Sequence, residues 1–129
     1  MESIKASIGT EHYKIEIVSP TGNLVIADEP VESGGQNKGF SPKELLASSL
    51  AACTLATLKM YADRKKWPLE KVDINVDLIE DEGKVIFKRK ITLHGKFELE
   101  QLDKFLKIAN ACPVHKILSG SSSVETEIQ

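Results

Sequence analysis

The sequence has little of several features that would assign it to a class of protein at once. It contains only two cysteines and one tryptophan among 129 residues, and 17 basic against 19 acidic residues leave a formal charge of −2. This near-neutral balance is spread along the chain, so we expect neither nucleic acid nor a membrane as a partner. A chain of this length fits one hydrophobic core, which predicts a single domain over residues 1–129.

A targeting segment is also missing from the sequence as given. The opening residues MESIKASIG contain no basic segment followed by an apolar run, as a secretory signal would. We therefore expect a cytoplasmic protein, in which two cysteines are more often packed or redox-active thiols than a permanent disulfide.

What is present is a regular alternation of strand and helix patterns. Alternation of apolar and polar residues with a period of two predicts two hairpins. Segments that are amphipathic, or that begin with a proline at the first helical position, predict helices. The expected strands are 4–8, 12–18, 23–28, 72–81, 84–95 and 122–128, and the expected helices are 42–66, from 99, and 113–118. Residues 29–39, rich in glycine and without periodicity, are expected to form a loop. The order βββ-α-ββ-αα-β favours an α+β fold with antiparallel strands.

The helix predicted from residue 42 is unusual because it lacks a polar stripe. Ser41 as N-cap, Pro42 at the first helical position and Glu44 predict its start as a capping box. From Leu45 to Ala62 the only charged residue is Lys59. The composition of this segment approaches that of a membrane span. Its Ser and Thr residues favour a buried central helix instead, and a second copy of the chain is the simplest cover for its other side, which predicts a homodimer.

The two cysteines allow three interpretations. Cys53 and Cys112 can be small apolar packing residues. Alternatively, the C-x-x-H spacing of Cys112 and His115, with Cys53 as a third ligand, would suit zinc. Third, Cys112 precedes Pro113 at a predicted helix start, a cap position where backbone N–H groups favour a reactive thiolate.

Two separated motifs carry a resemblance to a known family. GFSPKELLASSLAAC (39–53) and ACPVHKIL (111–118) are similar to the motifs of the OsmC/Ohr family, the osmotically inducible protein C and organic hydroperoxide resistance proteins. The resemblance implies an intertwined homodimer whose antiparallel sheets wrap around long central helices. It also implies a thiol peroxidase that uses no metal and no organic cofactor.

The same resemblance implies roles for the cysteines. Cys53 would attack an organic hydroperoxide and become a sulfenic acid, Cys112 would condense with it to a disulfide, and a dithiol reductant would restore both thiols. Family members with this activity place an arginine in the N-terminal strands and a glutamate directly after the helix-opening proline. Here the first arginine is Arg64, Lys43 follows Pro42, and Glu44 comes one position later.

The departure leaves the source of a cation beside Cys53 open. His12, Lys14 and Lys43 are the candidates near the N-terminal end of the chain, and Glu44 is explained by capping alone. An alternative function is therefore a dimer of the same fold that binds a small apolar ligand without peroxidase activity. Either ligand would contact apolar side chains near Cys53, for which the candidates are Phe40, Leu46 and Leu50, although these suit a core equally well.

Overall fold

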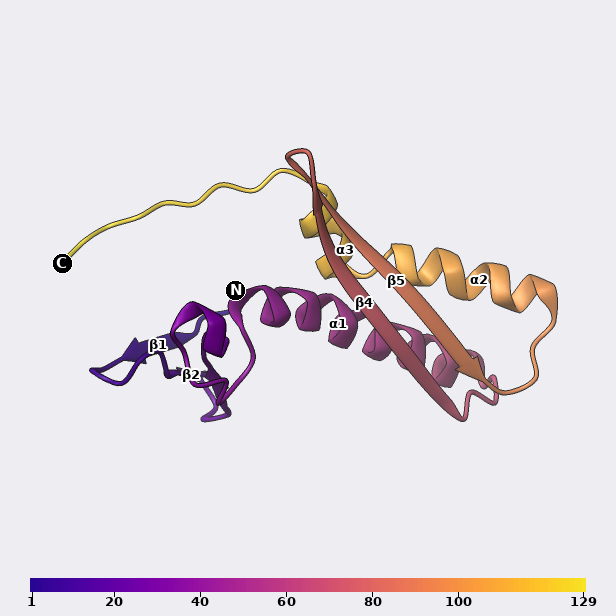
Figure 1. Cartoon of the computed structure of the whole chain (residues 1–129). Helices are drawn as coiled ribbons and strands as arrows, with labels where there is room; N and C mark the ends of the chain where they lie inside the picture. Colours follow the sequence, from indigo (N-terminus) through magenta and orange to yellow (C-terminus); the bar gives the residue numbers. More distant parts are fainter. The chain divides into compact units, whose positions relative to one another are not determined.

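The computed structural model describes all 129 residues, and these form two compact units, residues 1–47 and 48–129 (Figure 1). Three helices and two small antiparallel sheets make up the chain, so the predicted α+β class is confirmed. Whether the two units act as the single predicted domain stays a prediction.

The first unit contains a three-stranded antiparallel sheet in the order β1-β2-β3. Its strands are β1 (Lys5–Ile8), β2 (Ile15–Val18) and β3 (Leu24–Ala27). Pro20 and Gly22 lie in the turn between β2 and β3, where Gly22 takes φ of 91°, a conformation that glycine adopts without strain. The predicted first hairpin and the strand before it are therefore confirmed.

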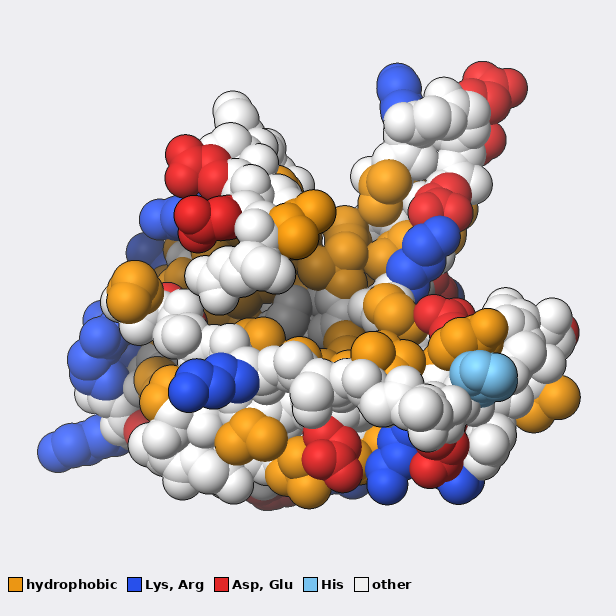
Figure 2. Space-filling view, turned by 90° about the vertical axis from the view of Figure 1, so that its left-hand side faces the viewer, with side chains coloured by type: hydrophobic (Ala, Val, Ile, Leu, Met, Phe, Trp, Pro, Cys, Tyr) orange, Lys and Arg blue, Asp and Glu red, His pale blue; other side chains and the backbone are white.

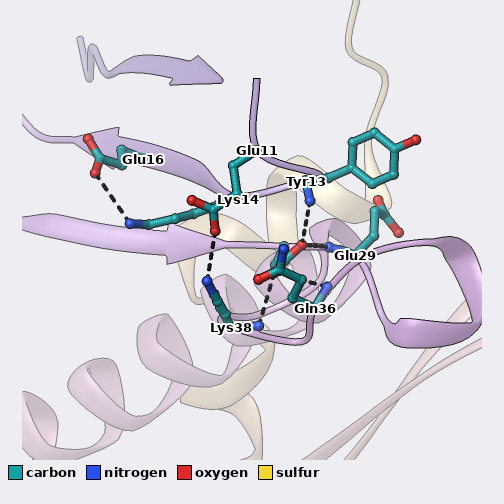
Figure 3. Close-up of polar contacts among 8 residues, drawn as sticks. Glu11, Tyr13, Lys14, Glu16, Glu29, Gln36 and Lys38 are labelled. Carbon is teal, nitrogen blue, oxygen red and sulfur yellow. Dashed lines mark hydrogen bonds and ion pairs between the residues drawn. The ribbon is translucent and has the colours of Figure 1, made fainter. Parts of the chain in front are cut away.

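The loop after β3 is organised by one buried carboxylate, that of Asp28, which is only 1% exposed. It accepts hydrogen bonds from the backbone N–H groups of Tyr13, Glu29, Gln36 and Lys38 at 2.7–3.3 Å (Figure 3). Burial raises the pKa of Asp28, but these backbone donors together lower it below its usual value. The loop of residues 29–39 thus folds around an anion, with a short 3-10 turn at Val31–Ser33.

Asp28→Asn is expected to lower the melting temperature at pH 7 and to flatten its dependence on acid. Because the folded pKa is lowered, the carboxylate's contribution to stability is present above the unfolded pKa of about 3.9 and is lost as pH falls through the folded value. Melting curves from pH 7 to pH 2 would show the difference. Equal slopes for the wild type and the variant would contradict it, with the exposed Glu16→Gln as a matched control.

Helix α1 (Pro42–Lys65) begins in the first unit and continues into the second. The predicted capping box is present, since the Ser41 N–H donates to Glu44 Oε1 at 2.8 Å and the Glu44 N–H donates to Ser41 Oγ at 3.3 Å. By length and composition α1 could cross a membrane, but a core helix passes the same test. Five of its side chains are buried within one chain: Leu50, Thr54, Leu58, Tyr61 and Ala62.

The second unit joins the rest of α1 to a long hairpin and two helices. Strands β4 (Lys71–Asp81) and β5 (Lys84–His94) pair antiparallel across a two-residue turn. Both turn residues, Glu82 and Gly83, have positive φ, which suits the right-handed twist of a hairpin. Helices α2 (Leu99–Asn110) and α3 (Pro113–Ser119) follow (Figure 1).

The core of the second unit centres on aromatic side chains. Phe105 of α2 is 2% exposed and meets three other rings edge-on, with centroid separations of 5.1–6.4 Å. These rings belong to Tyr61, Trp67 and Phe97. The cluster holds the end of α1 against α2, which leads directly to Cys112.

The strand predicted at residues 122–128 is wrong, because the structure has no strand after α3. The two apolar residues of this segment, Val124 and Ile128, are 91% and 94% exposed. A strand requires backbone hydrogen bonds to a neighbouring edge, and within one chain this segment has no such partner.

Candidate functional site

The two cysteines, remote in sequence, lie together in the second unit. Cys112 is the N-cap of α3 with Pro113 at the first helical position, as predicted, and its sulfur accepts a hydrogen bond from the His115 N–H at 3.3 Å. Cys53 lies on α1 directly before Thr54, whose hydroxyl is 4.0 Å from the Cys112 sulfur, so the two thiols lie near each other. Both are free thiols in this structure.

The two thiols differ in exposure and surroundings. Cys112 is fully buried, whereas Cys53 is half-buried and lies 4.0 Å from the Thr57 hydroxyl. Burial raises the pKa of Cys112, but the hydrogen bond from the His115 N–H and the polar contacts with the Cys53 thiol and the Thr54 side chain together lower it below its usual value. These contacts therefore stabilise the thiolate of the more deeply placed sulfur.

Arg89, which is not among the site residues predicted from the sequence, lies beside this pair. Arg89 of β5 donates hydrogen bonds to Thr54 Oγ1 at 3.0 Å and to His115 Nδ1 at 2.8 Å. A signal for it exists in the alternation of β5, because Arg89 shares the more buried face of the strand with Phe87 and Ile91. A charge in an apolar row of a strand is a candidate for a site.

A pocket of about 280 Å³ adjoins Arg89 and His115. Its wall is mainly apolar, and its polar groups come from β5 and α3. The residues that line it are Leu50, Val85, Ile86, Phe87, Arg89, His115, Leu118 and Ser119. A small molecule with an apolar body and a polar head fits such a lining.

Of the predicted contact residues, Leu50 is in this lining, whereas Phe40 and Leu46 belong to the first unit. Phe40 is 54% exposed and forms a single bridge with Ala27, and Leu46 is 43% exposed. Lys43 is exposed, and Glu44 caps α1. The predicted roles of Phe40, Leu46, Lys43 and Glu44 toward a substrate stay predictions.

The candidate cations at the N-terminal end belong to the first unit, and a role for them beside Cys53 stays a prediction. Lys14 lies 3.9 Å from Glu16, and His12 is exposed. No group of three His, Cys, Asp or Glu side chains is arranged to hold a metal ion. The Nδ1 atom of His115, one of the three ligands considered for zinc, is already engaged by Arg89.

This α+β chain carries two free thiols near each other, and one of them lies at a helix cap and has a lowered pKa. Proteins that use thiol redox chemistry have this arrangement. Comparison with known proteins narrows this class. The family model described as OsmC-like protein matches residues 35–127, and the chain belongs to the OsmC family. The predicted family resemblance is confirmed.

Relatives of known name or structure support the assignment. A hydroperoxide reductase of Mycoplasma pneumoniae is 29% identical over 99 residues, which cover 70% of each chain. The crystal structure of an OsmC-like protein from the same organism has a TM-score of 0.79 at 23% identity and covers 93% of this chain and 88% of that one. The organic hydroperoxide resistance protein OhrB of Bacillus subtilis has a TM-score of 0.59 at 23% identity and covers 93% and 91%. The predicted OsmC-like fold is thereby confirmed.

Proposed function

We propose that this protein is a thiol peroxidase that reduces organic hydroperoxides through Cys53 and Cys112. The observation that carries the proposal is that folding brings these two thiols, far apart in the sequence, near each other. Family membership and the hydroperoxide reductase of Mycoplasma pneumoniae support the choice of substrate class.

Exposure supports the order of the two thiols. A hydroperoxide from solvent can reach the half-buried Cys53 more readily than the fully buried Cys112. The Cys53 thiolate attacks the terminal peroxide oxygen, the O–O bond breaks, and the alkoxide takes up a proton to leave as the alcohol. Cys53 is then a sulfenic acid.

The lowered pKa of Cys112 suits the second step. Its thiolate attacks the Cys53 sulfur, the S–O bond breaks, and the departing hydroxide takes up a proton to become water. A dithiol reductant then restores both thiols by exchange, so the cycle oxidises the dithiol and reduces the peroxide. No metal or organic cofactor takes part.

We further propose that the protein acts as a cytoplasmic homodimer. Large hydrophobic side chains reach the surface between charged ones (Figure 2), and Met60 on α1 is 70% exposed. A second copy of the chain would cover such residues. Light scattering should then give twice the 14.2 kDa mass of one chain, and a lone protomer at micromolar concentration would refute the dimer.

A second candidate function is the binding of a small apolar ligand without turnover. The mainly apolar pocket beside His115 and the absence of arginine before Arg64 favour it.

Consumption of cumene hydroperoxide with a dithiol such as dihydrolipoamide separates the two functions. A peroxidase is expected to consume peroxide catalytically, with one dithiol oxidised per peroxide reduced. A protein that only binds ligand gives no consumption above that of the reductant alone, and this result would overturn the peroxidase proposal.

A further inference from the structure

Arg89 is bonded to all three helices around the thiols. Its Nη1 donates to Thr54 Oγ1 of α1 and to the Ala109 carbonyl of α2, each at 3.0 Å. Its Nη2 donates to Asn110 Oδ1 at 3.0 Å and to His115 Nδ1 of α3 at 2.8 Å. The four hydrogens of the two terminal nitrogens thus have one acceptor each.

The groups that accept from Arg89 also touch the thiol pair. Thr54 follows Cys53 in α1, and its hydroxyl lies 4.0 Å from the Cys112 sulfur. The Ala109 carbonyl that accepts from Arg89 also accepts from the Cys112 N–H at 3.3 Å. Any shift of the guanidinium therefore moves atoms in direct contact with Cys112.

The bond to His115 fixes the ring as well as the helix. A guanidinium only donates, so Nδ1 of His115 must accept and the proton of the neutral ring lies on Nε2. The backbone N–H of the same residue donates to the Cys112 sulfur. Arg89 thereby holds the residue that stabilises the Cys112 thiolate.

None of the four acceptors carries a negative charge, so the guanidinium is not held there by an ion pair. Arg89 is half-buried, and a half-buried cation is tolerated because each terminal N–H is satisfied. A lysine in its place would keep the charge but could not reach four acceptors in a planar arrangement.

We propose that Arg89 is the positioning residue of the thiol pair: it holds α1, the end of α2 and α3 in the register that lets Cys53 and Cys112 form their disulfide. The proposal rests on the Cys53–Cys112 cycle proposed above. It assigns a role to a residue of β5 rather than of the N-terminal strands.

The test follows disulfide closure in Arg89→Met and Arg89→Lys after oxidation by diamide, a thiol oxidant that needs no peroxidase activity. Closure is measured by rapid alkylation of the remaining thiols and mass spectrometry, well below the melting temperature of each variant. Because closure depends on sulfur geometry, we expect it to slow by roughly ten- to a hundredfold in Arg89→Met. Arg89→Lys should recover only part of the rate, and Arg64→Met, which alters the other, exposed arginine, should leave it unchanged.

A second measurement excludes a merely structural effect. The ring ¹⁵N shifts of His115 should report the Nε2–H form in the wild type and a mixture of forms in both Arg89 variants. Arg89→Lys retains the charge and keeps the proposal testable if Arg89→Met unfolds. Disulfide closure at the wild-type rate in Arg89→Lys would overturn the proposal.

The outcomes also separate this inference from the proposed function. Slow closure in the Arg89 variants of a protein that consumes no hydroperoxide would leave the positioning role standing and remove the peroxidase. Catalytic turnover of hydroperoxide, with disulfide closure at the wild-type rate in both Arg89 variants, would support the peroxidase and remove the positioning role of Arg89.

Discussion

Cys53→Ser is expected to lower kcat/KM for an organic hydroperoxide by at least about a thousandfold, because the variant lacks the atom that is oxidised. A serine hydroxyl is hardly ionised at neutral pH and does not form a stable analogue of a sulfenic acid. The measurement is peroxide consumption with a dithiol reductant, at matched protein concentration.

The fold should survive this change. Cys53 is half-buried, and serine replaces its sulfur by a single smaller oxygen. An unchanged melting temperature would show that the loss is chemical, and Ser49→Ala, on the exposed side of the same helix, serves as a control for substitutions in α1. An undiminished rate in Cys53→Ser would remove Cys53 from the reaction and with it the proposed cycle.

Local sequence signals predicted the elements that local bonding stabilises. Ser41 and Glu44 form their capping box from residues three positions apart, and α1 ends at Lys65, one residue before its predicted end. The position of Cys112 at a helix cap followed from the proline after it, since a proline suits the first helical position. Such contacts are within reach of a pattern argument.

The rest of the site depends on contacts between distant segments. Arg89 lies on β5, yet its acceptors come from α1, α2 and α3, and no spacing in the sequence indicates that they converge. Asp28 likewise accepts from backbone groups on both sides of it, such as those of Tyr13 and Lys38. Any residue type can supply a backbone N–H donor, so these donors leave no signal in the sequence. The alternation that predicted β3 therefore could not show that Asp28, directly after the strand, is a buried anion.

The strand at residues 122–128 was predicted from a local pattern, but the contacts that a strand needs are absent. Alternation of Val124 and Ile128 with polar residues is a local pattern, but a strand forms only where a neighbouring edge offers hydrogen bonds. The same limit applies to α1, whose apolar sides exceed what one chain covers. For both segments the local pattern gives the polarity of the residues but not what covers them.

Cys112→Ser is expected to leave the first oxidation of Cys53 nearly unchanged and to stop the cycle after it. The sulfenic acid then has no neighbouring thiolate to condense with, so it should accumulate and be trapped by dimedone. With excess hydroperoxide it should advance to the sulfinic acid, which dithiols do not reduce. Mass spectrometry of Cys53 after a single addition of peroxide, with and without excess, measures both results.

The pH dependence of the wild type completes this prediction. Because the pKa of Cys112 is lowered, its thiolate remains populated below the ordinary thiol value of about 8.5, and disulfide closure should stay fast until pH falls through the lowered value. The rate of closure, measured by stopped acid quench between pH 5 and pH 9, would then have its midpoint below that of a free cysteine peptide. A midpoint at or above the peptide's, or repeated turnover of hydroperoxide by Cys112→Ser at the wild-type rate, would contradict the assignment of Cys112 as the thiol that resolves the sulfenic acid.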